Sequence, residues 1–207
     1  MVKKSDRPHH IIKTTLGLAA TGHWTSSGLR DIAEAADVSL AELHTLYPSK
    51  TAILKAYFDS VDASVIGTKF VFGEEDGPRD RLFDVLMRRF DTLSEDRDGV
   101  IAILDALRRD PITALCLSSG LPGSMRWMLE TGGIKATGLS GRLIVKGLSA
   151  VWLATLRVWM SDDSEDMART MSALDKNLHR AGRIYSFLPT GRQNRRPAEP
   201  EQNVAPA

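Results

Sequence analysis

Residues 29–50 read LRDIAEAADVSLAELHTLYPSK, and this stretch decides the fold. Ile32 and Ala36 belong to an apolar set at helical spacing, which predicts a short helix with one buried face. A tight polar turn follows, and Ser39 is a good N-cap for a second short helix that ends near Tyr47. The stretch therefore predicts two short helices packed around a sharp corner.

Helical patterns continue on both sides of this corner. A first helix is expected from near Pro8 to Gly22, because proline suits a first turn and glycine suits a helix end. Either serine of the Ser-Ser-Gly run at residues 26–28 could cap the helix that follows it. A long fourth helix is expected after residues 48–50, ended by the polar linker at residues 73–78.

The remainder of the chain also has helical periodicity. No run alternates for long enough to predict a strand, so the fold class is all-α. Residues 139–159 have nearly the length of a membrane span, but Arg142, Lys146 and Arg157 interrupt them, which favours a buried central helix. Helical segments are expected at 79–93, 100–107, from 111 to a break at 121–123, and at 124–130, 139–159 and 163–188.

The composition is that of a globular protein without disulfides. Of 207 residues, 43% are hydrophobic and the net charge is only +1, so nucleic-acid or membrane binding must come from a local cluster. The single cysteine, Cys116, has apolar neighbours, which fits a reducing compartment. The N-terminus lacks the apolar core of a signal peptide, so we expect a cytoplasmic protein. Residues 189–207 are polar and expected to be a disordered tail.

The pattern over residues 10–60 resembles the DNA-binding motif of the TetR family of ligand-responsive transcriptional regulators. The match covers the first motif helix, the turn, the buried Leu43 and Tyr47, and the start of the next helix. The resemblance implies a TetR-like fold in which residues 1–50 form a three-helix DNA-binding head with a helix-turn-helix. Residues 51–188 then form a helical body for ligand binding and dimerisation. The function implied is that of a repressor controlled by a small apolar ligand.

A two-turn helix braced by tight turns can enter the major groove, which is ~12 Å wide, and present its outer side chains to base edges. The resemblance places those side chains on the second motif helix. Phosphate contacts are expected from the N-terminal end of the preceding helix, the start of the fourth helix and a loose basic arm that includes Arg7. The predicted DNA-contacting residues are Lys3, Lys4, Ser27, Arg30, Ser39, Leu40, Ala41, Glu42, His44, Thr45, Tyr47 and Lys50.

This reading surface departs from the family pattern. Leu40, Glu42, His44 and Leu46 stand where family members commonly carry a cation, a small hydroxyl, and aromatic or basic residues. Over residues 1–50 there are six positive and five negative side chains, which offer little phosphate neutralisation. A three-helix head that no longer binds DNA is therefore the alternative interpretation of this motif.

The body is expected to form a homodimer and to hold a ligand, as family bodies do. The helices at 139–159 and 163–188 are long and adjacent, which suits an isologous four-helix contact. Glycine and proline breaks around Trp127 favour a cavity, although ordinary core is the favoured interpretation for any single candidate residue. The predicted ligand-binding residues are Phe90, Cys116, Met125, Trp127, Met128, Trp152 and Trp159.

Residues 124–128 and 152–166 also resemble, more distantly, the coenzyme Q biosynthesis accessory protein family (the ninth Coq protein), which has a TetR-like fold but binds isoprenoid lipid. This resemblance implies an alternative function, a lipid-binding accessory protein of ubiquinone biosynthesis. The family's acidic and aromatic stretch is absent after Trp127. From Lys176 onward cations outnumber anions by six to two, which suits either peripheral membrane contact or a dimer helix with a solvated tail.

No catalytic or metal-binding pattern is visible in the sequence. The five histidines show no pairing with carboxylates or with Cys116 at ligand spacing. There is no glycine-rich phosphate loop and no nucleophile elbow. We therefore expect a protein without cofactor, metal or enzyme activity.

Overall fold

The computed structural model describes residues 6–187, and side chains up to residue 183. This part of the chain is helical, without strands, as the sequence predicts. The helices are α1 (Arg7–Ala20), α2 (Leu29–Ala35), α3 (Leu40–Leu46), α4 (Lys50–Ile66), α5 (Pro78–Ser94), α6 (Arg97–Leu107), α7 (Pro111–Ser118), α8 (Leu121–Thr131), α9 (Gly138–Trp159) and α10 (Ala168–Phe187).

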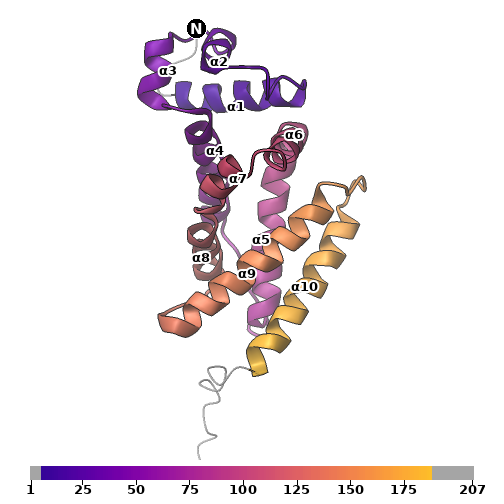
Figure 1. Ribbon diagram of the computed structural model, residues 1–207. Helices are drawn as coiled ribbons and strands as arrows, with labels where there is room; N and C mark the ends of the chain where they lie inside the picture. The colour runs from indigo at the N-terminus through magenta and orange to yellow at the C-terminus, as the bar shows by residue number, and fades with distance from the viewer. Residues whose placement is uncertain (1–5, 188–207) are drawn as a thin grey trace, which may run out of the picture.

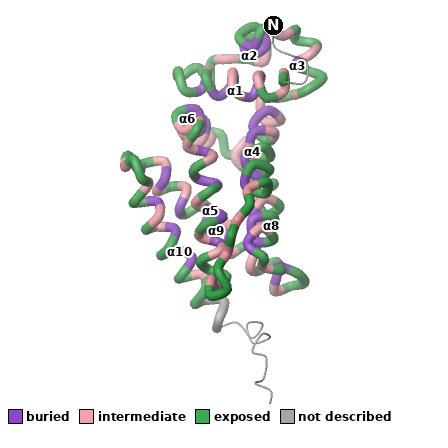
Figure 2. The backbone as a smooth tube through the Cα atoms, turned by 180° about the vertical axis from the view of Figure 1, so that it is seen from behind, coloured by how far each residue is buried: buried purple, intermediate pink, exposed green. Residues whose placement is uncertain are grey.

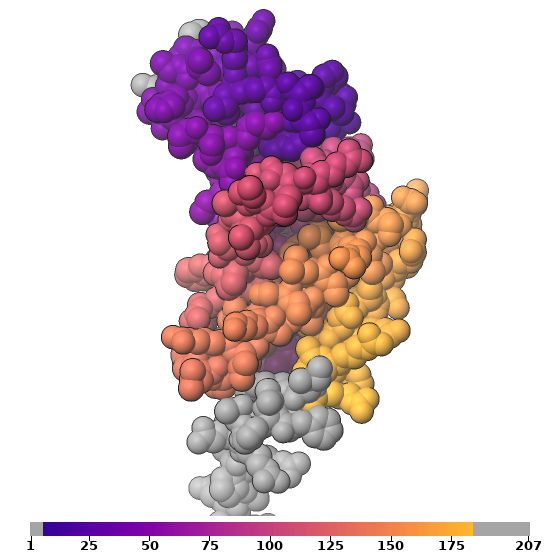
Figure 3. Space-filling view, in the orientation of Figure 1, coloured from indigo at the N-terminus to yellow at the C-terminus, as the bar shows by residue number. Residues whose placement is uncertain are grey.

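The helices form a small head on an elongated body. Helices α1, α2 and α3 lie together at one end, and α4 runs from this head down into the body beside α5 (Figure 1). The head sits directly above α6 and α7 in the space-filling view (Figure 3). Helices α9 and α10 form an antiparallel pair along the body, with α9 packed on α8 and α10 on α5. The predicted division at residue 50 stays a prediction, since α4 begins there and serves both parts.

Local caps explain several helix boundaries. The Ser39 hydroxyl accepts a hydrogen bond from the Glu42 amide at 3.1 Å, and Ser49 does the same for Ala52 at the start of α4. The cap of α2 differs from the prediction, because Gly28 occupies that position instead of a serine. The Asp31 carboxylate accepts the Gly28 amide at 2.6 Å, which is the half of a capping box that an acidic residue in the first turn supplies.

Three other boundaries differ from those expected. Helix α4 ends at Ile66, well before the linker at 73–78. The predicted break at 121–123 lies within the first turn of α8, where a proline fits a helix start. Helix α10 begins at Ala168, five residues later than expected, because the preceding acidic stretch forms a corner that caps it instead of joining it.

The buried apolar side chains form one continuous core from the head through the body. Buried residues line the inner faces of α4, α5, α8 and α9, while outer faces are exposed (Figure 2). Of the described helices, α9 alone is long and apolar enough to cross a membrane, and 33% of its most apolar window is buried. It packs one face on α8 and α10, so the expected burial of this helix holds for that face, while Leu139, Leu143 and Leu153 are exposed.

Head and body meet where α1 crosses α6. A Cβ built on Gly99 of α6 would lie only 2.5 Å from the Leu16 carbonyl oxygen of α1, so only glycine permits this approach. Beside this contact, the Lys13 ammonium donates to both carboxylate oxygens of Asp96 at 2.7 Å. Burial, together with the nearby Asp96, raises the pKa of Tyr57 on α4. The orientation of the head is thus set by close packing and an ion pair.

Candidate nucleic-acid interface

The corner between α2 and α3 has the geometry that the sequence predicts. Asp37 adopts a left-handed conformation with φ +52°, and the Val38 amide donates to the Ala33 carbonyl at 3.0 Å. Ile32 of α2 and Leu43 of α3 are 1% and 0% exposed, so each helix buries one face in the head. The opposite face of α3 is therefore left at the surface.

The outer face of α3 carries small, apolar and weakly polar groups. Leu40, Ala41, His44 and Thr45 are exposed, and none is covered by another part of the described chain. The Thr45 hydroxyl donates to the Ala41 carbonyl at 2.9 Å, which holds its methyl group in a defined position. This face offers methyl groups, one hydroxyl oxygen and one imidazole to a binding partner.

Glu42, the acidic member of the predicted reading surface, is neutralised within the head. Its carboxylate forms an ion pair with Arg7, and the two side chains are only about a quarter exposed. Arg7 is the first residue of α1, so it does not belong to a loose arm as the sequence suggested. The repulsion that Glu42 would exert on phosphates is therefore offset by a cation held beside it.

Lys50 is engaged inside the protein. Its ammonium donates to the carbonyl oxygens of Trp24 and Ser27, the latter at 2.9 Å, and lies 4.0 Å from the centroid of the Trp24 ring. Burial lowers the pKa of Lys50, with Asp31 opposing that shift. Lys50 thus ties the start of α4 to the connection between α1 and α2, and it stabilises the head from within.

The remaining predicted contacts vary in accessibility. Arg30 is exposed and has no ion pair in the part of the chain that the structure describes, whereas Ser27 is half-buried. Tyr47 is also half-buried, and its hydroxyl donates to the Pro8 carbonyl at 3.4 Å. Burial raises the pKa of Tyr47, which keeps the phenol neutral. The predicted contacts Lys3 and Lys4 lie outside the described residues, as do the predicted tail 189–207 and most of the basic C-terminal segment.

The seven predicted ligand-binding residues do not gather around a cavity. Phe90 stacks on Trp152 with ring centroids 4.4 Å apart and lies 6.0 Å from the Trp159 ring. These three side chains, with those of Met125 and Met128, belong to the closely packed core. The other two, Cys116 and Trp127, are exposed, and Trp127 keeps 58% of its surface accessible. Their role in ligand binding stays a prediction.

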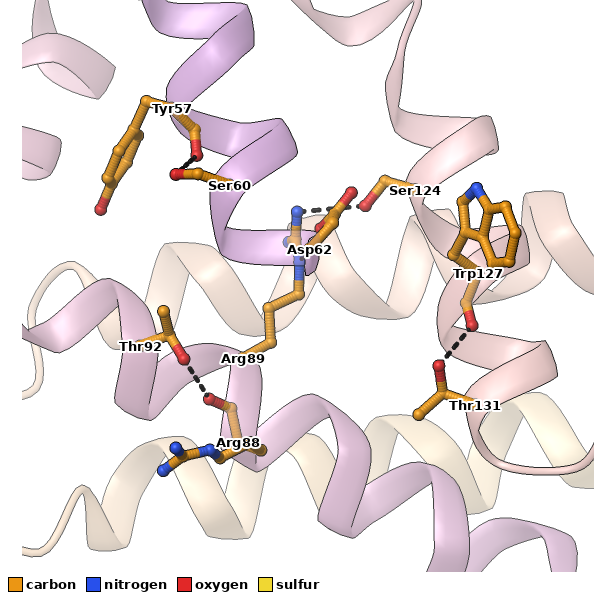
Figure 4. Close-up of polar contacts among 9 residues, drawn as sticks. All are labelled: Tyr57, Ser60, Asp62, Arg88, Arg89, Thr92, Ser124, Trp127 and Thr131. Atoms are coloured by element: carbon orange, nitrogen blue, oxygen red, sulfur yellow. Dashed lines mark hydrogen bonds and ion pairs between the residues drawn. The ribbon is translucent and has the colours of Figure 1, made fainter. Parts of the chain in front are cut away.

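The structure reveals a buried ionic cluster that the sequence analysis missed. The Arg89 guanidinium of α5 donates to Asp62 of α4 at 2.9 Å and to Ser124 of α8 at 3.1 Å (Figure 4). It also lies 4.1 Å from the centroid of the Trp152 ring. Burial lowers the pKa of Arg89, while Asp62 opposes this effect. Trp127 lies farther along α8, away from this cluster. Arg89 lies on the apolar stripe of α5, at helical spacing from Leu86 and Leu93. This position is the sequence signal that could have predicted its burial.

A groove between α9 and α10 was missed as well. Its volume is about 470 Å³, within the range of small-molecule sites. Its floor comes from the start of α5 and the end of α8, and its walls from α9 and α10. None of the seven predicted ligand residues lines it. Among the described residues, no group of three or more His, Cys, Asp or Glu side chains is placed to hold a metal ion.

Comparison with known proteins identifies the fold. No protein-family model matches the sequence, and no curated protein matches it. A TetR transcriptional regulator from Nitrosomonas europaea superposes with a TM-score of 0.67 at 22% identity, covering 84% of this chain and 97% of that chain. A TetR transcriptional regulator from a Rhodococcus species gives 0.65 at 16% identity, covering 87% and 97%. A TetR-family transcriptional regulator from Streptomyces coelicolor gives 0.58 at 17%, covering 89% and 84%. The chain therefore has the TetR fold, and the resemblance to the coenzyme Q family is not confirmed.

Proposed function

We propose that this protein is a dimeric transcriptional repressor that binds DNA through α3 and works in the cytoplasm without catalysing a reaction. The observation that carries this proposal is the exposed outer face of α3 on a capped, well-packed corner. The same fold in three transcriptional regulators supports it.

The chemistry of α3 indicates how bases would be read. Leu40 and Ala41 offer apolar contact to the methyl group of thymine, and His44 can hydrogen-bond to a base edge. Arg30 supplies a phosphate contact near the start of α2, with Lys3 and Lys4 as further candidates. Since few cations are available, we expect modest affinity and a shallow dependence on salt.

The homodimer would form along α9 and α10, as the sequence predicts. Leu139 and Leu153 are 78% and 52% exposed on the outer side of α9, which suits an isologous contact. Such a dimer would present its two α3 helices to successive major grooves about 34 Å apart. A ligand bound in the body would regulate the protein by changing this separation.

An electrophoretic mobility shift assay on the DNA upstream of the protein's own gene, run over a salt series, tests this function. We expect a retarded complex that weakens as salt rises. Arg30→Ala should weaken binding about equally for all sequences and reduce the salt slope by about one. His44→Ala should instead relax sequence preference, at a cost of about 1–3 kcal/mol at its own base position.

The matched control is Arg109→Ala, which removes an exposed arginine of the body at the C-terminal end of α6. It should leave both affinity and salt slope unchanged. Equal behaviour of Arg30→Ala and Arg109→Ala would contradict the placement of the interface. Absence of any salt-dependent complex, with the fold intact by circular dichroism, would contradict the proposed function itself.

A further inference from the structure

The groove between α9 and α10 lies at the end of the body farthest from the head. The two helices pack against each other, and a hollow opens between them toward the start of α9 and the end of α10 (Figure 3). The residues facing this hollow are almost all aliphatic. They include Leu82, Leu129, Ile134, Ile144, Leu148, Val151 and Leu178.

The width of the groove comes from small residues at positions where larger ones would fit. Gly147 of α9 and Gly182 of α10 both line it, and a Cβ added at either would meet nothing within 4 Å. A glycine inside a helix is less stable than alanine by about 0.5–1 kcal/mol. Packing does not require glycine at these two positions, because a Cβ would fit at both. Both helices are therefore less stable than they would be with alanine, at positions that line the groove.

The charged residues at the groove are all cationic. Arg79 and Arg180 line it, and no aspartate or glutamate is among its lining residues. Arg79 is paired with Asp175, which is not a lining residue. Arg180 is exposed and forms no ion pair within residues 6–183, so its guanidinium is available to an incoming anion. The groove thus combines an aliphatic surface with one available cation, Arg180.

We propose that this groove binds a single-chain anionic amphiphile, with the alkyl chain along the aliphatic floor and the anionic head at Arg180. The proposal does not depend on DNA binding, because the groove and α3 are at opposite ends of the molecule. An anionic amphiphile in this groove would be the ligand that changes the separation of the two α3 helices. The groove is a different site from the seven ligand-binding residues predicted from the sequence.

A second copy of the chain is a poorer occupant of this groove. Arg79 is already offset by Asp175, but an isologous contact centred here would bring Arg180 of both copies together with no lining carboxylate to offset it. The exposed Leu139 and Leu153 are not among the lining residues, whereas Leu143, also exposed on α9, is one of them. A dimer contact on this side of α9 would therefore border the groove at Leu143.

Isothermal titration calorimetry with the full-length protein tests the proposal, with dodecanoate as the probe below its micellar concentration. Dodecyltrimethylammonium has the same chain with a positive head, and should bind at least about tenfold more weakly. Gly147→Leu fills the groove and should weaken dodecanoate binding by about tenfold or more. Arg180→Gln should weaken dodecanoate by about threefold to fivefold and leave binding of uncharged dodecanol unchanged.

Gly17→Leu is the matched control, because Gly17 is a helical glycine of the head with nothing within 4 Å of its added Cβ. It should bind dodecanoate like the unchanged protein. Equal loss in Gly17→Leu and Gly147→Leu, or equal affinity for the anionic and cationic amphiphiles, would overturn the proposal. The proposal would also be overturned if the unchanged protein did not bind dodecanoate and Gly147→Leu sedimented as a monomer while the unchanged protein sedimented as a dimer. That pair of results would assign the groove to a second copy of the chain. Each outcome is independent of the mobility shift assay.

Discussion

Removal of the Asp62 carboxylate should destabilise the protein far more than an ordinary surface substitution. Its partner Arg89 has a side chain only 4% exposed, and Asp62 itself is 13% exposed. In Asp62→Ala the guanidinium would keep the Ser124 hydroxyl and the face of Trp152, but it would lose its compensating charge in a site closed to water. Breaking a buried ion pair from one side costs about 3–5 kcal/mol, which is a large fraction of a typical folding free energy.

Replacement of both partners gives the opposite expectation. In the double variant Asp62→Leu with Arg89→Met, apolar side chains of similar volume fill the site and no charge remains buried. Such replacements are commonly neutral, or stabilising by about 1–4 kcal/mol. The double variant should therefore be more stable than Asp62→Ala by several kcal/mol, even though it contains more changes.

Guanidinium chloride unfolding followed by circular dichroism measures these differences, at one fixed protein concentration because a dimer's stability depends on it. Asp59→Ala is the control, since Asp59 also pairs with a cation on α4 but has 61% of its side chain exposed. It should change stability by under about 0.5 kcal/mol. A loss below about 1 kcal/mol in Asp62→Ala would refute the reasoning, because it would mean that Arg89 reaches water.

Three further expectations concern other contacts. Gly99→Ala places a Cβ 2.5 Å from the Leu16 carbonyl oxygen, so α1 must move from α6, and unfolding should show a loss of about 1–3 kcal/mol. At Asp162, burial raises the pKa, but hydrogen bonds from Ser164 and Thr170 outweigh it and hold the pKa below its ordinary value. The stabilisation by the Asp162 carboxylate is full above its ordinary pKa of about 3.9 and is lost as pH falls through the lowered pKa. Asp162→Asn should therefore be less stable than the unchanged protein at pH 7, and the difference in unfolding free energy between the two should shrink in acid. Glu42→Gln releases the Arg7 charge, so mobility shifts should show tighter DNA binding with a salt slope steeper by about one phosphate contact.

Each of these expectations has a result that would contradict it. Gly123→Ala, in α8 with nothing within 4 Å of the added Cβ, should be neutral or stabilising by up to about 1 kcal/mol, and a loss there equal to that of Gly99→Ala would remove the steric explanation for Gly99. A difference between Asp162→Asn and the unchanged protein that persists undiminished far below pH 4 would contradict the assigned hydrogen bonds. Unchanged or weaker DNA binding by Glu42→Gln would show that Arg7 does not reach phosphate.

Several parts of the fold could be predicted because they depend on neighbours in the chain. The Ser39 cap accepts an amide three residues ahead, so residue type and spacing were enough to place the start of α3, and the break at residues 48–50 placed the start of α4. The start of α2 was placed correctly, but its cap was wrongly assigned to a serine, because Gly28 occupies that position and Asp31 accepts its amide. The late start of α10 was missed because Ser164 and Asp166 accept the Ala168 amide, and Asp162 accepts the Thr170 amide, from outside the helix.

The sequence by itself determined the helical class, the α2–α3 corner and the identity of the residues on the outer face of α3, since helical periodicity and capping act within a few residues. Only the tertiary structure decided that Glu42 is neutralised by Arg7, that Lys50 is engaged internally, and that the aromatic side chains Phe90 and Trp152 fill the core. It also decided where space remains, because a groove is the gap left when four helices pack. Charge pairing and packing join residues far apart in the chain, and no local pattern records which of them will meet.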